Sequence, residues 1–393
     1  MQAPTLQELA PAGHDLAADP HSVYAALRAT GPVHRVHVPD SGDAWLVLGH
    51  AEARAALGDP RLRNDIRHSA TWQDDGGHAV GRNMLQTDPP RHTRLRRTVA
   101  GHFTPGRVAS YRPGIEDIAV RLVDAFAGDG RVDVVSRYAL PLPVMVICDL
   151  LGVPQDDRDT FHAWSRELVA PTSRTAAGEA SAALAGYLAG LIRRAPGAPG
   201  SSLLGELAGD AHDRLGAEEI LGMAFLLLVA GHETTVSLIS GTLHGLLTHP
   251  AQLAQVYADP ALIGRAVEES LRFHTPVHAS AFRFAADPLD LGGTRIAAGD
   301  SVIVSLAAAS RDPLRFADPD RFDLHREPGG HLAFGHGLHH CLGAPLARAE
   351  TEIALRVLLE RHPALGLAAD PAPLVWRTGT LLRGLVRLPL DLG

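Results

Sequence analysis

The chain has 393 residues, and 46% of them are hydrophobic, which is enough apolar material for a large buried core. Its formal net charge is −8, and no block of Lys and Arg stands out from this acidic background, which argues against a nucleic-acid-binding protein. The two cysteines, Cys148 and Cys341, cannot form a disulfide framework, and such cysteine usage suits a reducing, cytoplasmic environment.

The beginning of the chain carries neither a basic start nor a long apolar run, so we expect a soluble protein without a signal peptide or membrane anchor. Apolar residues at helical spacing predict a first helix over 21–30, which Gly31 and Pro32 end. Alternating apolar and polar residues then predict two strands, at 33–38 and 45–48. A short helix is predicted at 50–57. The polar stretch 61–84 predicts a loop.

A basic helix is predicted after Thr87 and two prolines, residues that favour helix starts. It contains His92 and Arg96, which stand four residues apart and therefore share one face. Basic clusters of this kind are usually solvated.

Five more helices are predicted through the middle of the chain, at 111–126, 139–151, 158–169, 177–194 and 217–248. The last and longest has polar residues in its apolar centre, Glu233 and Thr234 among them, and buried polar groups are costly without a role. A threonine hydroxyl can bond the preceding carbonyl and bend the helix. Alternatively, Ala230 and Gly231 leave a groove for a flat molecule, beside which Glu233 and Thr234 supply an acid and an alcohol.

The last third of the chain mixes strands, loops and one further pair of helices. A helix over 260–273 carries Glu269 and Arg272 at i, i+3, which alone is an ordinary helix ion pair. A long loop is predicted at 311–331. Strands are predicted before it, at 275–284 and 302–306, and after it, at 374–376 and 381–386.

A glycine-rich loop brings Cys341 to the start of a helix predicted over 342–359. Unpaired N–H groups and the dipole at a helix start favour a thiolate, which is the form of cysteine that binds metals. Gly335 and Gly337 permit a sharp turn, and Gly343 lets a flat group lie close to the helix. Cys341 is then an inert buried thiol, a zinc ligand or the axial thiolate of a haem iron. The nearby histidines lack the repeated spacing of structural zinc sites.

The order Phe334-Gly-x-Gly-x-His339-x-Cys341-x-Gly343 resembles the cysteine loop of the cytochrome P450 family. Three other stretches resemble that family in the same order: the Asp-Pro-Pro-x-His-x-x-x-Arg element at 88–96, Ala-Gly-x-Glu-Thr-Thr at 230–235 and Glu-x-x-Arg at 269–272. The resemblance covers essentially the whole chain. It implies a mainly α fold with small β-sheets, in which residues 1–393 form a single-domain, triangular helical prism that encloses haem.

The resemblance also implies residue roles. Cys341 is expected to be the metal ligand of haem b (iron protoporphyrin IX), and Glu233 and Thr234 to guide protons to the oxygen being reduced. The expected haem-binding residues are His92, Arg96, Ala230, Arg283, Gly335, His339, Cys341 and Gly343. Arg96 and His92 are expected on one propionate and Arg283 on the other. Glu269, Arg272 and Arg321 are expected to hold the cysteine loop.

The implied activity is that of a bacterial monooxygenase, which inserts one atom of O2 into an organic substrate and releases the other as water. The chain has neither a dinucleotide-binding fingerprint nor a cysteine cluster, so electrons from NAD(P)H are expected through a ferredoxin and a ferredoxin reductase. Arg96, Arg97 and Arg348 are the expected contacts for an acidic ferredoxin on a monomeric enzyme. An H2O2-using peroxygenase would have little need of Glu233 and Thr234, and a haem sensor would need a signalling region.

The expected substrate-binding segments are 61–85, 226–230, 276–279 and 378–381, which are mostly small or aliphatic. Individual candidates are Leu85, Leu226, Ala230, Val277, His278 and Thr380. Such a lining suits a large apolar molecule with few polar groups. The chain most resembles actinobacterial members that tailor macrolides and other polyketides in antibiotic biosynthesis, which favours hydroxylation or epoxidation of such a compound. A terpenoid or steroid is the alternative.

Overall fold

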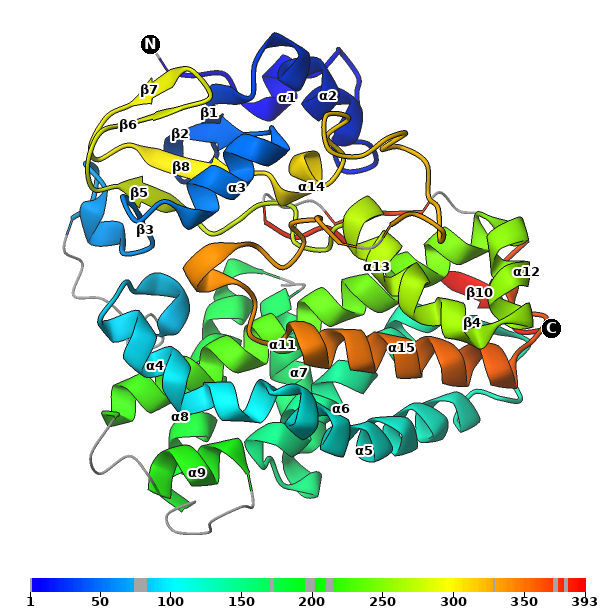
Figure 1. The fold of residues 1–393 in the computed structure, drawn as a ribbon. Coiled ribbons are helices and arrows are strands. Elements are labelled where there is room, and N and C mark those ends of the chain that lie inside the picture. The colour runs from blue at the N-terminus through cyan, green and yellow to red at the C-terminus, as the bar shows by residue number, and fades with distance from the viewer. Residues whose placement is uncertain are drawn as a thin grey trace.

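The computed structural model describes residues 2–73, 83–169, 173–194, 202–209, 215–327, 329–369, 374–377 and 381–393. A sheet with short helices lies at one side of the molecule, and long helices make up the other side (Figure 1). The segment that precedes α15 (Ala344–Arg361) passes between these two parts, so the cysteine loop lies where they meet.

The main sheet has five strands in the order β1-β2-β8-β5-β3. Their bounds are Val33–Val38, Gly42–Val47, Ser301–Val304, Arg283–Ala285 and Leu62–Arg63. The β1–β2 hairpin pairs Val33 with Val47, and β2 runs parallel to β8 with Trp45 opposite Val302. The remaining pairs are antiparallel. Short helices on this side are α1 (Leu6–Leu9), α2 (His21–Thr30), α3 (His50–Gly58) and α14 (Leu306–Ala309).

Two smaller sheets complete the strands. In one, β10 (Pro389–Asp391) lies between β4 (Arg131–Asp133) and β9 (Gly366–Leu367). The other is the hairpin of β6 (Leu289–Leu291) and β7 (Thr294–Ile296). Because β10 pairs with a strand from the first half of the chain, the C-terminal end is fastened to the helical side.

The helical side is built around α11 (Ala217–Leu247), which contacts α6, α8, α13 and α15. The other helices are α4 (Arg91–Ala100), α5 (Pro105–Asp124), α6 (Pro141–Leu151), α7 (Arg158–Val169), α8 (Arg174–Arg194), α9 (Leu203–Gly209), α12 (Pro250–Ala258) and α13 (Ile263–Phe273). By length and composition α11 could cross a membrane, but 61% of its most apolar window is buried inside the protein. It is the core helix of this bundle.

Most helices begin and end close to the predicted residues, and α2 and α7 match them at both ends. The strand predicted over 275–284 is wrong. Only single bridges form there, at Val277 and Ala279, before β5 begins at Arg283. Thr275 has a φ of 40°, and Pro276 has no N–H to donate, so the backbone cannot continue a regular ladder. Similarly, the described part of the last predicted hairpin forms one bridge, between Trp376 and Leu385.

Candidate active site

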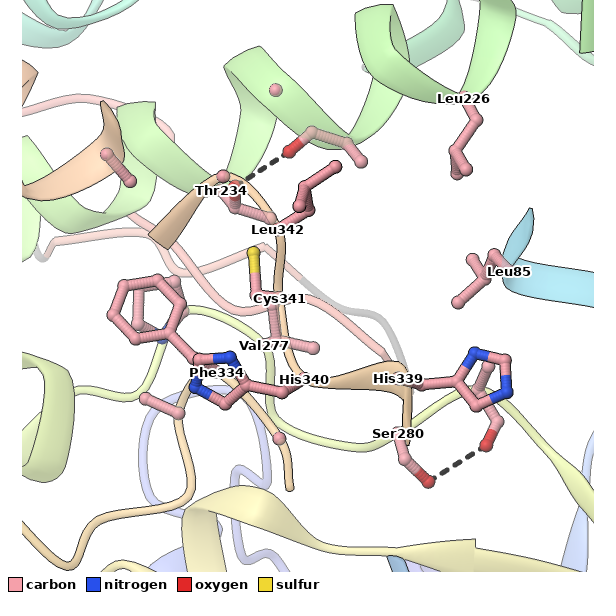
Figure 2. Close-up of a pocket in the computed structure, with 18 of the residues that line it drawn as sticks. Leu85, Leu226, Thr234, Val277, Ser280, Phe334, His339, His340, Cys341 and Leu342 are labelled. Atoms are coloured by element: carbon pink, nitrogen blue, oxygen red, sulfur yellow. Dashed lines mark hydrogen bonds between the residues drawn. The ribbon is translucent and has the colours of Figure 1, made fainter. Parts of the chain in front are cut away.

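A cavity lies between α11 and the cysteine loop, and the sheet side closes its lower edge (Figure 2). The space open to the centre of a water molecule is about 280 Å³, so the cavity bounded by the side-chain surfaces is larger. Its wall is mostly aliphatic and aromatic, with polar side chains gathered near His92 and His339.

Cys341 projects from the loop into this cavity, and Figure 2 shows its sulfur directed toward Thr234 of α11. The thiol is exposed to the cavity yet enclosed by the protein. The Cys341 N–H donates to the carbonyl of Phe334 at 2.9 Å, which closes the loop. Cys341 precedes the first residue of α15, Ala344, by three positions, so the helix begins two residues later than predicted.

The glycines of the loop have distinct roles. Gly335 and Gly337 both have a φ of 71°, a conformation that favours glycine. A Cβ on Gly337 would also lie 2.8 Å from the Leu57 carbonyl oxygen at the end of α3, so the close approach of loop and helix needs a residue without a side chain. Gly343 lines the cavity beside the sulfur.

Burial raises the pKa of the Cys341 thiol, whereas the N–H groups of Gly343 and Ala344 and the charge of Arg96 act in the opposite direction. The predicted helix-start effect is therefore present, but in the protein alone it does not overcome desolvation. A coordinated metal ion would reverse the balance, because a thiol bound to a metal is deprotonated.

On the opposite wall, the hydroxyl of Thr234 donates to the carbonyl of Ala230 at 2.9 Å, and Thr235 donates to Gly231 at 3.1 Å. Ala230, Gly231 and Thr234 all line the cavity. A Cβ on Gly231 would lie 3.2 Å from Ile147 of α6, which shows how tightly the two helices pack here. The absence of large side chains at Ala230 and Gly231 leaves open the space that faces Cys341.

Glu233 is the exception on this helix. Its side chain is buried, but it is not part of the cavity wall, and its carboxylate forms an ion pair with Arg377. Glu233 and Thr234 were predicted to act at the same site. In the structure, Thr234 lines the cavity, whereas Glu233 lies outside its wall.

Cationic and imidazole groups gather at one end of the cavity. The rings of His92 and His339 lie 4.3 Å apart, and Arg283 is buried beside them. Within the described part of the chain, both ring nitrogens of His92, Nε2 of His339 and Nε of Arg283 have no hydrogen-bond partner. Buried donors without partners are costly, so this group is suited to an anionic ligand. Arg96 also lines the cavity, but its Nη2 donates to the His340 carbonyl at 2.7 Å.

The predicted substrate residues divide into three outcomes. Leu85, Leu226, Ala230 and Val277 line the cavity, and Figure 2 shows Leu85 and Leu226 on the side away from Phe334. The placement of His278 is corrected: it is buried outside the wall, with its ring 5.8 Å from that of His21. Thr380 lies outside the described residues, as does 74–82 of the predicted 61–85 segment.

Asn64, which belongs to the predicted 61–85 segment, lines the cavity, whereas several other residues of the wall were not predicted: Phe103, Ile147, Leu238, Ser280, Leu346 and Glu350. Leu342, Leu346 and Glu350 follow Cys341 at helical spacing, so the period of α15 could have identified the latter two. Burial raises the pKa of Glu350 well above the usual range of a carboxyl group. Ile147 comes from α6, whose approach to the cavity no local pattern reveals.

The predicted support of the cysteine loop is partly corrected. Arg272 holds Glu269 through two bonds, of 2.8 and 2.7 Å, and also donates to the Pro319 carbonyl at 2.7 Å. The third side chain at Glu269 is Arg326, at 3.4 Å, whereas Arg321 contributes only its carbonyl oxygen. A motif of spaced residues cannot show which of two neighbouring arginines turns inward.

Comparison with known proteins extends these observations. The sequence profile of the family described as Cytochrome P450 matches residues 201–364. The monooxygenase PikC of Streptomyces venezuelae is 50% identical over 393 residues, which cover 99% of this chain and 94% of PikC. The chain belongs to the cytochrome P450 family. It is an enzyme of the P450 monooxygenase class, which uses haem and O2.

Other P450 relatives are nearly as similar. The 6-deoxyerythronolide B hydroxylase of Saccharopolyspora erythraea is 42% identical, with 95% of this chain and 96% of that protein covered. The solved structure of the P450 monooxygenase TamI bound to tirandamycin C superposes with a TM-score of 0.89 at 43% identity, covering 97% of this chain and 99% of that one. The mainly α fold with small sheets is thus the fold of this family.

The residues of this P450 fit a haem. A lone thiol faces a space kept open by small residues, and unpaired donors stand at one end, where two carboxylates of the macrocycle would need them. No group of three or more His, Cys, Asp or Glu side chains among the described residues could hold a metal ion by itself. The zinc interpretation of Cys341 and its neighbouring histidines therefore has no support from the geometry.

Proposed function

We propose that this P450 hydroxylates or epoxidises a large apolar natural product of the macrolide or polyketide type, as a soluble, cytoplasmic and monomeric enzyme. The observation that carries the proposal is the cavity wall, in which Leu85, Leu226, Val277 and Phe103 face the space beyond Cys341. A wall of this kind recognises shape and apolar area rather than charge. Relatives named for macrolide and polyketide compounds, among them the Micromonospora griseorubida mycinamicin IV hydroxylase/epoxidase at 42% identity, agree with it.

Polar recognition in this cavity rests on few groups. Ser280 is already satisfied, since its hydroxyl donates to the Ala281 carbonyl at 2.8 Å and accepts from the Val304 N–H at 3.1 Å. Asn64 donates to the Leu85 carbonyl at 2.8 Å, while its Oδ1 has no partner among the described residues. A substrate hydroxyl that donates to Asn64 would satisfy this oxygen.

In the proposed mechanism, Cys341 would supply the thiolate that holds the haem iron, and Gly335 and Gly343 would leave room for the group. Arg96 and Arg283 would offer positive charge to its propionates, and His92 and His339 would offer hydrogen bonds. The bound haem supplies the activation of O2. The residues that line the cavity come from segments far apart in the chain. We therefore propose that residues 1–393 function as a single domain.

We propose that α11 contributes proton transfer and an apolar surface that excludes bulk water. The Thr234 hydroxyl already donates to Ala230, so its oxygen is held at the cavity surface and can accept or pass on a proton there. Glu233 is the nearest carboxylate of the same helix. The apolar wall around them excludes bulk water, which limits stray protonation.

Electrons from NAD(P)H are proposed to arrive through a ferredoxin and its reductase, on the side of the cysteine loop that faces away from the cavity. Two of the three arginines expected to contact the ferredoxin already have partners within this chain. Arg348 is paired with Glu268 at 2.5 Å, and Arg96 donates to the loop itself. Arg97 is exposed, and no ion pair joins it to another described residue, which leaves it free for an acidic partner.

Titration of the ferric enzyme with candidate substrates tests the proposed function. Macrolide aglycones, other polyketides, steroids, terpenes and fatty acids are added in turn, and the Soret band is followed. We expect the spectral shift of displaced water with macrolides or polyketides, and then oxygenated product when NAD(P)H, ferredoxin and reductase are supplied. Shifts with fatty acids or small terpenes alone would overturn the substrate assignment.

A steroid or terpenoid is the second candidate. A Pseudonocardia autotrophica vitamin D(3) 25-hydroxylase is 44% identical over 95% of this chain, and a Streptomyces avermitilis pentalenic acid synthase is 41% identical. The same apolar wall would accept a rigid hydrocarbon skeleton with one hydroxyl near Asn64. In the titration, a steroid that binds more tightly than every polyketide would favour this second assignment.

A further inference from the structure

Arg377 lies against the carboxylate of Glu233, and the two side chains form an ion pair. The Glu233 side chain is 3% exposed and that of Arg377 is 21% exposed, so the pair runs from the core toward the surface. Among the described residues, neither carboxylate oxygen of Glu233 has a hydrogen-bond donor, and Arg377 is the cation that pairs with its Oε1. Burial lowers the pKa of Arg377 without removing its charge at neutral pH.

The segment that carries Arg377 is fixed against α11. The Arg377 N–H donates to the Gly384 carbonyl at 2.9 Å, and the Val386 N–H donates to Val375 at 2.9 Å. A Cβ on Gly384 would lie 2.3 Å from Oγ of Ser237, so this two-stranded segment touches the helix one turn after Glu233. The backbone on both sides of the ion pair is therefore held by contacts that do not involve the pair itself.

This placement decides where the Glu233 carboxylate points. A buried carboxylate without a cation is strongly disfavoured, so the paired orientation is the stable one. In that orientation Glu233 is absent from the cavity wall, whereas the adjacent Thr234 is part of it. The carboxylate must rotate, or pass a proton through water, before it can serve the cavity.

We propose that Arg377 is a positioning residue that holds Glu233 ionised and turned away from the cavity between proton deliveries. This inference rests on the proposed function of Glu233 and Thr234 in proton supply. Each delivery takes one proton from water at the partly exposed edge of Arg377, converts the carboxylate to the acid, and returns it to the carboxylate when the proton passes toward Thr234. Arg377 thereby connects the protein surface to the buried Glu233 carboxylate, which does not line the cavity.

The first test needs no turnover. Thermal unfolding of the ferric holoenzyme is measured for wild type, Arg377→Met, Glu233→Gln and the double variant, at about pH 5 and about pH 8. We expect Arg377→Met to unfold several degrees earlier than wild type at the higher pH, because it leaves a buried unpaired carboxylate. The deficit should shrink at the lower pH, where that carboxylate takes up a proton, and most of it should disappear in the double variant.

The second test follows product formed per NAD(P)H oxidised. We expect Arg377→Met to lose several-fold in this ratio, with O2 reduced to H2O2 by the same two electrons and two protons. Arg377→Lys should retain at least half of the wild-type ratio, and the double variant should be no worse than Glu233→Gln. Arg383→Met is the matched control: Arg383 belongs to the same segment and lies 3.6 Å above the Trp376 ring. It should lower stability without any dependence on Glu233.

The outcomes separate the two proposals. Additive effects of Arg377→Met and Glu233→Gln on unfolding would show that the pair does not form, and would overturn the inference even if no substrate is ever found. Wild-type coupling in Arg377→Met, in an enzyme that does turn over, would overturn it while leaving the monooxygenase function intact. Failure of every variant and of wild type to oxygenate any substrate would instead count against the proposed function.

Discussion

At the level of single residues, Thr234 combines two contacts that a threonine inside a helix seldom has together. Its hydroxyl donates to Ala230 at 2.9 Å, and the same group lies on the cavity wall opposite Cys341. The hydrogen bond to Ala230 holds the Thr234 hydroxyl oxygen in place, and its position on the cavity wall brings it within reach of a molecule bound there. Its contribution should therefore be chemical more than structural.

We predict that Thr234→Ala still oxidises NAD(P)H but releases H2O2 instead of product. Positioned proton transfer contributes roughly 10²–10⁴-fold, so the product per NAD(P)H should fall severely. Thr242→Ala is the control, because Thr242 makes the same type of bond, to Leu238 at 2.7 Å, but is buried away from the cavity. Unchanged coupling in Thr234→Ala, or equal losses in the two variants, would contradict the role of Thr234.

The direction of a side chain was predictable only where the local backbone restricts it. Cys341, Ala230 and Thr234 face the cavity because a loop before a helix and a small residue on a helix restrict where they can point. Glu233 and His278 depend on partners far along the chain, Arg377 and His21. No local pattern identifies such partners, so the direction of both side chains required the structure.

At the level of elements, the cysteine loop depends on its contact with the end of α3. Gly337 has a φ of 71°, and a Cβ there would lie 2.8 Å from the Leu57 carbonyl oxygen and 3.2 Å from Cα of Gly58. Both neighbours are backbone atoms, so they cannot move aside cheaply. The position of the thiol is thereby tied to the sheet side of the molecule.

We predict that Gly337→Ala destabilises the protein and lowers its haem content. The strained φ alone costs about 1–3 kcal/mol, and the backbone overlap adds to it. Gly293→Ala is the control: Gly293 has a φ of 78°, with nothing within 4 Å of the added Cβ. Urea unfolding and haem content per protein should show a larger loss for Gly337→Ala. Equal losses would mean that the contact with α3 is unimportant.

Helices with a regular apolar pattern were predicted well, and segments without regular secondary structure were predicted poorly. The helices 21–30 and 158–169 were found at both ends because their apolar faces and end signals agree. The stretch 275–284 has strand-like composition but lacks a ladder, since Thr275 and Pro276 impose their own backbone geometry. The choice of Arg326 over Arg321 at Glu269 likewise arises from the path of a long loop.

At the level of the whole molecule, a group of buried histidines lies where the C-terminal segment meets α11 and α13. His244 lies 5.7 Å from His274 and 5.8 Å from the Trp376 ring. Burial, together with a smaller effect of the nearby charge of Arg383, lowers the pKa of His244 to about 4 and that of His278 to about 3. These imidazoles are therefore neutral in the folded protein at neutral pH.

We predict that stability falls as the pH drops below about 6.5, the ordinary pKa of histidine. The unfolded chain takes up protons there and the folded protein does not, so each such histidine removes up to about 1.4 kcal/mol per pH unit. Unfolding by urea at pH values from about 7 to about 5 measures this slope. His278→Gln should have a shallower slope than wild type. An equal slope in both would show that His278 already binds its proton when folded.

On the proposed supply of electrons by a ferredoxin, Arg97 is a candidate contact, because it is exposed and has no ion pair among the described residues. We predict that Arg97→Glu slows reduction by an acidic ferredoxin several-fold at low salt, with the difference shrinking at high salt. Arg295→Glu on β7 is the control, since Arg295 is exposed but belongs to the hairpin at the sheet edge (Figure 1). Stopped-flow reduction at two ionic strengths is the measurement. A similar effect from both variants would indicate net charge rather than docking.

The central claim is that Cys341 holds the haem iron as a thiolate, and the spectrum of the reduced enzyme with CO tests it most directly. We predict that wild type and Cys148→Ala show the red-shifted Soret band of thiolate ligation, because Cys148 is buried in α6 away from the cavity. Cys341→Ser should lose that band. A histidine-type band from well-folded wild-type protein, or a red-shifted band that survives in Cys341→Ser, would contradict the account.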